Sequence, residues 1–115
     1  MLMSGDLDAT GEQALLARVD HGALASDVVL VGRQASEIAS STQWIESTAP
    51  GLAVATGGIA QARSRLGVLA RWRRVARVID TRREGGIQLR LSDRGVELVA
   101  MARTGRFPFH WRRPV

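Results

Sequence analysis

The chain has 115 residues, which fits one domain with short arms, and it contains no cysteine, which excludes disulfides and thiolate metal sites. It has no apolar run of membrane-spanning length and no leader-like basic start, so we expect no membrane association and a cytoplasmic, nucleoid-associated location. Residues 1–50 carry two arginines and seven acidic residues, a net charge of −5, and residues 51–115 carry fourteen arginines and four acidic residues, a net charge of +10. This division indicates a scaffold half beside a half that faces a polyanion, and ordinary surface charge is the alternative.

Residues 1–33 are expected to form an N-terminal arm and the start of a long helix. A short helix is predicted first, over Gly11–Val19, with Thr10 as its N-cap and Gln13 three residues later. The sequence Asp20-His21-Gly22 is expected to end this helix, because a glycine and two short polar residues favour a turn.

Apolar residues from Leu24 to Ile45 recur at alternating spacings of four and three, which is the seam of a heptad. The spacing predicts a long helix over about residues 24–46. A strand over Asp27–Val31 is the local alternative, because this stretch is rich in β-branched residues. The seam either packs on its own domain or pairs two copies of the chain. In the second case it is the dimerisation element of the expected homodimer.

Residues 34–103 are expected to form one winged helix-turn-helix domain. The predicted order is a short helix at 51–55, a turn at 56–58, a second helix at 59–72, a strand at 75–79, a hairpin turn at 84–86, a strand at 87–91 and a last helix that begins at Ser92. The expected fold class is therefore mainly α with a small β-hairpin (α+β), preceded by N-terminal helices. Residues 104–115 are expected to form an extended aromatic and basic tail.

Short motifs in this stretch resemble those of a known family. Leu52-Ala53, Thr56-Gly57, Leu66, Leu69, Val75 and Arg77 resemble the LA…TG…L..L…V.R pattern of winged helix-turn-helix bacterial regulators. Leu91-Ser92-Asp93-Arg94-Gly95 is similar to the Leu-Ser/Thr-x-x-Gly sequence that closes the wing in MarR-like proteins. The similarity covers about residues 35–100 and implies a DNA-binding transcriptional regulator. The wing is short, and the sequence does not show both of the long helices that build the dimer in MarR-like proteins. The resemblance therefore does not imply ligand sensing.

In this interpretation the helix at 59–72 enters the major groove, which is just wide enough for one helix. Its outer face is expected to carry Ala60, Ser64, Gly67 and Arg71. Gln61, Val68 and Arg65 are expected on one shoulder and Arg63 on the other. Arginines near the end of this helix and in a basic wing near 80–87 are expected to contact phosphates. The predicted DNA-binding residues are Gln61, Arg63, Ser64, Arg65, Arg71, Arg73, Arg74, Arg82 and Arg83.

Chemistry other than binding has little support in the sequence. The chain offers no nucleophile with an adjacent base, and Thr56-Gly57-Gly58 lacks the lysine and spacing of a phosphate loop. We therefore expect no enzyme activity, no cofactor and no metal. Trp44 and Trp72 are expected in a core or interface, and the tail aromatics either dock on the protein or accompany a minor-groove arm.

Three functions fit the pattern. The first is a homodimeric transcriptional regulator, most simply a repressor, that binds double-stranded DNA. The second is a replication or partition protein of plasmid or phage type that coats DNA sites. The third is a winged-helix module that binds another protein.

Overall fold

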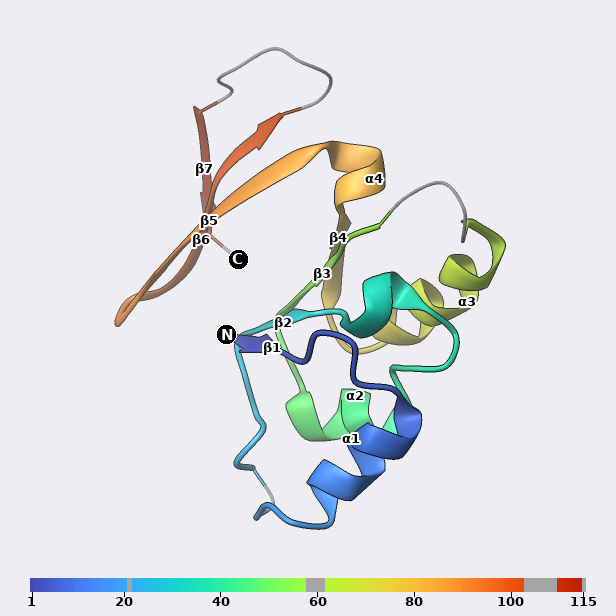
Figure 1. Ribbon diagram of the computed structural model, residues 1–115. Helices are drawn as coiled ribbons and strands as arrows, with labels where there is room; N and C mark the ends of the chain where they lie inside the picture. Colours follow the sequence, from blue (N-terminus) through green and yellow to red (C-terminus); the bar gives the residue numbers. More distant parts are fainter. Residues whose placement is uncertain (21, 58–61, 103–109, 115) are drawn as a thin grey trace.

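Four parallel strands form the centre of the structure, a computed structural model that describes residues 1–20, 22–57, 62–102 and 110–114 (Figure 1). The strands lie in the order in which they occur in the chain: β1 (Leu2–Met3), β2 (Val28–Leu30), β3 (Leu52–Ala55) and β4 (Arg77–Asp80). Every neighbouring pair is parallel. The fold is therefore α/β, and the expected mainly α winged helix-turn-helix is wrong.

Helical segments connect the strands. They are α1 (Ala9–Leu16) after β1, the 3-10 turn η1 (Gly32–Ala35) with α2 (Thr42–Thr48) after β2, and α3 (Ala62–Arg73) after β3. Because each connection advances to the next strand in the same direction, right-handed crossovers place all of them on one face of the sheet. The opposite face needs another cover.

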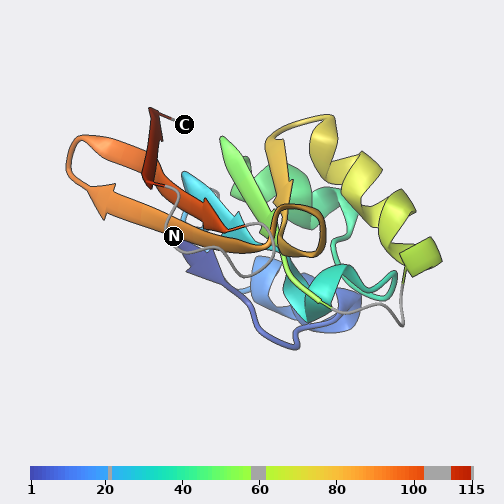
Figure 2. The same cartoon turned by 90° about the horizontal axis from the view of Figure 1, so that it is seen from above.

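The chain after β4 provides that cover. A short helix, α4 (Thr81–Glu84), leads into an antiparallel sheet of β5 (Gly86–Ser92), β6 (Gly95–Ala102) and β7 (His110–Pro114). In Figure 2, α3 and this antiparallel sheet lie on opposite sides of the parallel sheet.

Two clusters of buried side chains divide the core. On the helical face, Val29, Ala53 and Ala55 pack with Trp44 and Trp72, which confirms a core position for both tryptophans. On the other face, a second cluster joins the parallel sheet to β6 and contains Val28, Leu52, Val54, Ile79 and Leu98. Alternate residues of β2 and β3 thus enter opposite clusters, as the two-residue period of a strand requires.

The long helix expected over residues 24–46 is wrong, and the alternative strand within Asp27–Val31 is the one observed, as β2. The heptad spacing misled because Val28 and Val31 are buried in a central strand and in the loop after it, whereas Ile38 is 49% exposed. The seam residues are distributed over β2, η1 and α2, so no coiled-coil element is left for the expected homodimer.

Three other predicted elements are also wrong. The short helix at 51–55 is β3, whose four residues are all buried, and a strand covered on both faces is apolar throughout. The last helix, predicted from Ser92, is β6, which pairs with β5 in register from Ser92↔Gly95. The expected wing turn at 84–86 is the end of α4, so the hairpin lies one strand later.

Some local predictions are confirmed. The helix at 59–72 appears as α3 from Ala62, and the strands at 75–79 and 87–91 appear within β4 and β5. The helix at 11–19 appears as α1 but begins earlier, because Asp8 and not Thr10 caps it. Asp8 Oδ1 accepts the Gly11 N–H at 2.9 Å. Within the tail, residues 110–114 form β7, and the remaining residues lie outside the described part.

Candidate nucleic-acid interface

A line of exposed arginines follows the edge strand β4. Two lie where α3 ends, one opens β4, and two lie in α4 directly after β4; we call this set the basic edge: Arg73, Arg74, Arg77, Arg82 and Arg83. Helix α3 ends shortly before β4 begins, and α4 follows β4 directly, so the set occupies chain positions at both ends of that strand.

The basic edge is not neutralised by the protein. Between residues 73 and 84, five arginines face only Asp80 and Glu84, a net charge of +3. Among the described residues, the ion pairs are Arg65–Asp80 and Arg90–Glu97, and neither uses an arginine of the basic edge. Unpaired guanidinium groups on a surface are free to bind phosphate oxygens in a bidentate way.

Arg65 is not available to DNA, which corrects its predicted role. Its side chain is 2% exposed. The Nη1 group donates to the carbonyl oxygens of Gln34, at 2.8 Å, and Thr56, and Nη2 forms an ion pair with Asp80. The predicted shoulder of a recognition helix is thus its inner face, and Arg65 joins the loops after β2 and β3 to the last residue of β4.

Arg71 is also turned toward the protein. It is half-buried, and its Nη2 group donates to the carbonyl oxygen of Ser40 at 3.1 Å. It lines a hollow of about 200 Å³ between α2 and α3 together with Arg74 and Glu46. Arg71 therefore braces the loop before α2 and does not project as a base-reading side chain.

The outward face of α3 does not suit base recognition. In the described part of this face, Leu66 is 65% exposed and Gly67 and Ala70 are also exposed. None of these side chains has a hydrogen-bonding group for a base edge. Of the other predicted readers, Gln61 and the side chains of Arg63 and Ser64 lie outside the described residues.

A second polar region lies at the carboxyl ends of the parallel strands. Open α/β sheets bind ligands at this end where the strand order reverses, and the order β1-β2-β3-β4 has no such reversal. Asp6 and Asp8 lie in the loop after β1, which ends at Met3; Asp6 is exposed and Asp8 is half-buried. The neighbouring turn after β2 is strained, because Arg33, Gln34 and Ala35 all have positive φ, at 47°, 48° and 62°. Each such residue costs about 1–3 kcal/mol and is kept where surrounding contacts over-determine it.

Those surrounding contacts are visible at the strained turn. The Arg33 N–H donates to the Gly5 carbonyl at 2.9 Å, and the Arg33 Nη1 group donates to the Asp6 carbonyl at 3.0 Å. Arg65 holds the Gln34 carbonyl from the other side. Sequence reasoning did not single out Asp6 and Asp8; the available signal was two carboxylates separated by one residue in a short loop that follows an apolar segment.

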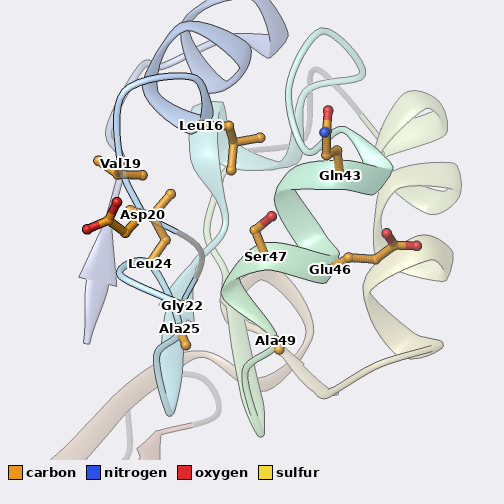
Figure 3. A pocket seen from close by; sticks show the side chains of 10 residues that line it. All are labelled: Leu16, Val19, Asp20, Gly22, Leu24, Ala25, Gln43, Glu46, Ser47 and Ala49. Carbon is orange, nitrogen blue, oxygen red and sulfur yellow. The ribbon is translucent and has the colours of Figure 1, made fainter.

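A larger hollow than the one between α2 and α3 lies at the other end of the sheet (Figure 3). It measures about 540 Å³ and lies between the end of α1, the segment after it and α2, with Leu16, Val19 and Leu24 among its apolar lining. Its charged lining residues are Asp20 and Glu46, both acidic. A hollow with this lining repels phosphate, so it is not part of the basic edge.

No family model, curated protein or solved structure matches this chain. The similarity to MarR-like regulators therefore depends on the short motifs alone, and the structure distributes those motifs over strands of an α/β sheet as well as helix α3.

Within the described residues, no helix has the length and apolar character that crossing a membrane requires. In the same part of the chain, no group of three or more His, Cys, Asp or Glu side chains is arranged to hold a metal ion.

Proposed function

We propose that this domain binds double-stranded DNA through the phosphate backbone, along the basic edge. The observation that carries this proposal is the set of five exposed arginines without an ion-pair partner among the described residues. Phosphate contacts supply affinity and orientation and carry no sequence information. The proposed binding is therefore only weakly selective for sequence.

The narrower role of transcriptional regulator needs a reader of base edges. Before its last residue, Arg73, the exposed and described part of α3 offers apolar and small side chains, and Arg65 and Arg71 are engaged inside the protein. Backbone binding fits the second expected role, a protein that coats DNA, better than it fits a repressor of one site. The winged-helix protein-binding module loses its basis together with the winged fold.

The salt dependence of duplex binding tests this proposal. If all five arginines contact phosphates, log Kd should rise against log salt concentration with a slope of about 4.5, since each phosphate contact contributes about 0.9. Fluorescence anisotropy of labelled 20-base-pair duplexes of several sequences, between 50 and 300 mM salt, measures that slope. A slope near zero, or no binding at low salt, overturns the proposal. A strong preference for one sequence favours a regulator.

The carboxyl ends of the parallel strands favour a second candidate function, phosphate ester chemistry with a divalent cation. Asp6 and Asp8 lie in the loop after β1, at the carboxyl end of that strand. Mg²⁺ is usually held by one or two carboxylates together with substrate phosphates. One oxygen of Asp8 already caps α1, so Asp6 offers the freer carboxylate.

This second candidate has its own test. Mg²⁺ or Mn²⁺ is added to the protein with a single-stranded or duplex substrate, and cleavage products are followed on a gel. Activity that depends on the cation and is lost in Asp6→Asn supports the candidate. Asp93→Asn, in the exposed β5–β6 turn, is the matched control that should retain activity. Absence of any product with either cation argues against it and leaves binding along the basic edge intact.

A further inference from the structure

Arg65 lies where the carboxyl ends of β2, β3 and β4 meet, and both terminal nitrogens of its guanidinium group are hydrogen-bonded. Its contacts are the carbonyl oxygens of Gln34 and Thr56 and the carboxylate of Asp80. Gly57 makes room for it, because a Cβ atom there would overlap the Arg65 Nη1 group. Because these contacts fix the position of the Arg65 guanidinium group, they also fix the position of the Asp80 carboxylate that pairs with it.

Asp80 links this buried arginine to the basic edge. The same atom, Asp80 Oδ1, accepts Arg65 Nη2 and the backbone N–H of Arg82 at 3.1 Å. Asp80 is thereby the N-cap of α4, the short helix that carries Arg82 and Arg83. Its side chain is 14% exposed, so it lies at the border between the interior and the basic edge.

Asp80 would have a different partner if Arg65 were absent. Arg82 and Arg83 are the arginines that follow it directly in the chain, and both are exposed. An unpaired carboxylate at this border attracts a neighbouring guanidinium, and an arginine paired in this way is no longer free for a phosphate. The buried pair thus decides how much positive charge this end of the basic edge presents.

We propose that Arg65 is a positioning residue for nucleic-acid binding, which holds the Asp80 carboxylate inward and so keeps Arg82 and Arg83 free for phosphate. This inference rests on the proposed function, because it concerns the same basic edge. Arg65 itself never touches the ligand.

The central comparison uses Arg65→Met and the double variant Arg65→Met/Asp80→Asn. Arg65→Met leaves the carboxylate without its buried partner. The added Asp80→Asn change removes the carboxylate but keeps an N-cap for α4, since asparagine is among the best capping residues. Arg18→Gln is the matched control, because Arg18 is exposed in the acidic half and its loss changes the formal charge by the same amount.

Arg65→Met should lower the slope of log Kd against log salt by about 0.9, because one carboxylate neutralises one arginine. The same substitution should weaken duplex binding roughly eightfold at 0.1 M salt. Arg65→Met/Asp80→Asn should restore the wild-type slope. Arg18→Gln should keep it. In an Arg82→Gln/Arg83→Gln background, Arg65→Met should leave the slope unchanged, because the arginines through which it acts are gone.

A purely structural role for Arg65 predicts different results. In that case Arg65→Met lowers the melting temperature but leaves the slope of log Kd against log salt unchanged in the folded protein. The slope therefore distinguishes a structural role from a positioning role. Where Arg65→Met does not fold, Arg65→Gln gives the same comparison, because its amide can still donate to one of the two carbonyls. A wild-type slope in the folded variant, or a reduced slope that Asp80→Asn does not restore, overturns the inference alone. A wild-type protein that does not bind duplex DNA overturns the proposed function as well.

Discussion

The Glu12 carboxylate on α1 accepts the backbone N–H of Ser40 at 2.7 Å, although the two residues are 28 positions apart in the chain. Its other oxygen accepts the N–H of Ser41 at 2.9 Å, and Glu12 is fully buried. The Ser40 hydroxyl in turn accepts the Trp72 indole N–H at 2.9 Å. One loop residue thus joins α1 to α3 through hydrogen bonds, and an acid from the expected scaffold half becomes part of the core.

Replacement of Glu12 by alanine should destabilise the protein strongly. One buried and one part-buried N–H group would lose a charged acceptor. A hydrogen bond to a charged group contributes about 1.5–3 kcal/mol, so we expect a loss of about 2–6 kcal/mol. Urea denaturation followed by circular dichroism measures it. Glu37→Ala, at an exposed position without a described side-chain bond, should change stability by less than about 0.5 kcal/mol. Equal effects at both positions would contradict a buried role for Glu12.

Replacement of Ala49 by glycine should stabilise the protein. Ala49 ends α2 in the left-handed region, with φ 38° and ψ 51°. Glycine adopts this conformation without the steric cost that Cβ imposes, which is about 1 kcal/mol. The matched control is Ala14→Gly, at an exposed position inside α1, which should destabilise by about 0.5–1 kcal/mol. Opposite shifts of the melting temperature are expected, and a loss in both variants would argue against the left-handed cap.

The local elements that sequence reasoning predicted correctly are those with a single strong signal. The strand within 87–91 alternates apolar and polar residues because one face of β5 is covered. The apolar spacing of Ile59, Ala62, Leu66 and Leu69 predicts the helix but not its inner face, because Leu66 is 65% exposed and the buried side carries Val68, Leu69 and Trp72. The basic character of the region around β4 also follows directly from the sequence. These features give local structure and charge, and they do not fix the topology.

The topology was missed because strands that are buried on both faces show no alternation of apolar and polar residues. Val28–Leu30 and Leu52–Ala55 are covered on both faces, so their apolar runs resemble pieces of buried helix. Pairing between β2 and β3 joins residues more than twenty positions apart, and no local pattern encodes it. The inward turn of Arg65 was missed for a related reason, because its partner Asp80 comes close only once the parallel sheet forms.

Truncation of Leu98 tests the packing of the antiparallel sheet on the parallel one. Leu98 on β6 is fully buried in the cluster that contains Leu52 and Ile79. Leu98→Ala should cost about 2–5 kcal/mol, through lost burial and the cavity left behind. Leu91→Ala on β5 is the control, because Leu91 is 48% exposed and its loss should have little effect. Denaturant midpoints measure both, and similar small losses would mean that the two sheets do not share a core.

Paired substitutions along the basic edge should separate its two ends. Arg73→Gln/Arg74→Gln removes the arginines at the end of α3, and Arg82→Gln/Arg83→Gln removes those in α4. Each pair should lower the salt slope of duplex binding by about 1.8 and weaken binding roughly 60-fold at 0.1 M salt. Because all four side chains are exposed, the melting temperature should change little.

The control for this charge removal is Arg90→Gln/Arg94→Gln on the antiparallel sheet, which subtracts the same formal charge. Both arginines are exposed, and Arg90 pairs with Glu97 at 3.4 Å, so the basic edge keeps all five of its guanidinium groups. If the protein binds DNA only through diffuse positive charge, all three pairs will weaken binding equally. If the basic edge is the interface, the control will keep the wild-type slope while each edge pair loses about two phosphate contacts. A control that weakens binding more than either edge pair would move the interface to the antiparallel sheet and contradict the proposed function as stated.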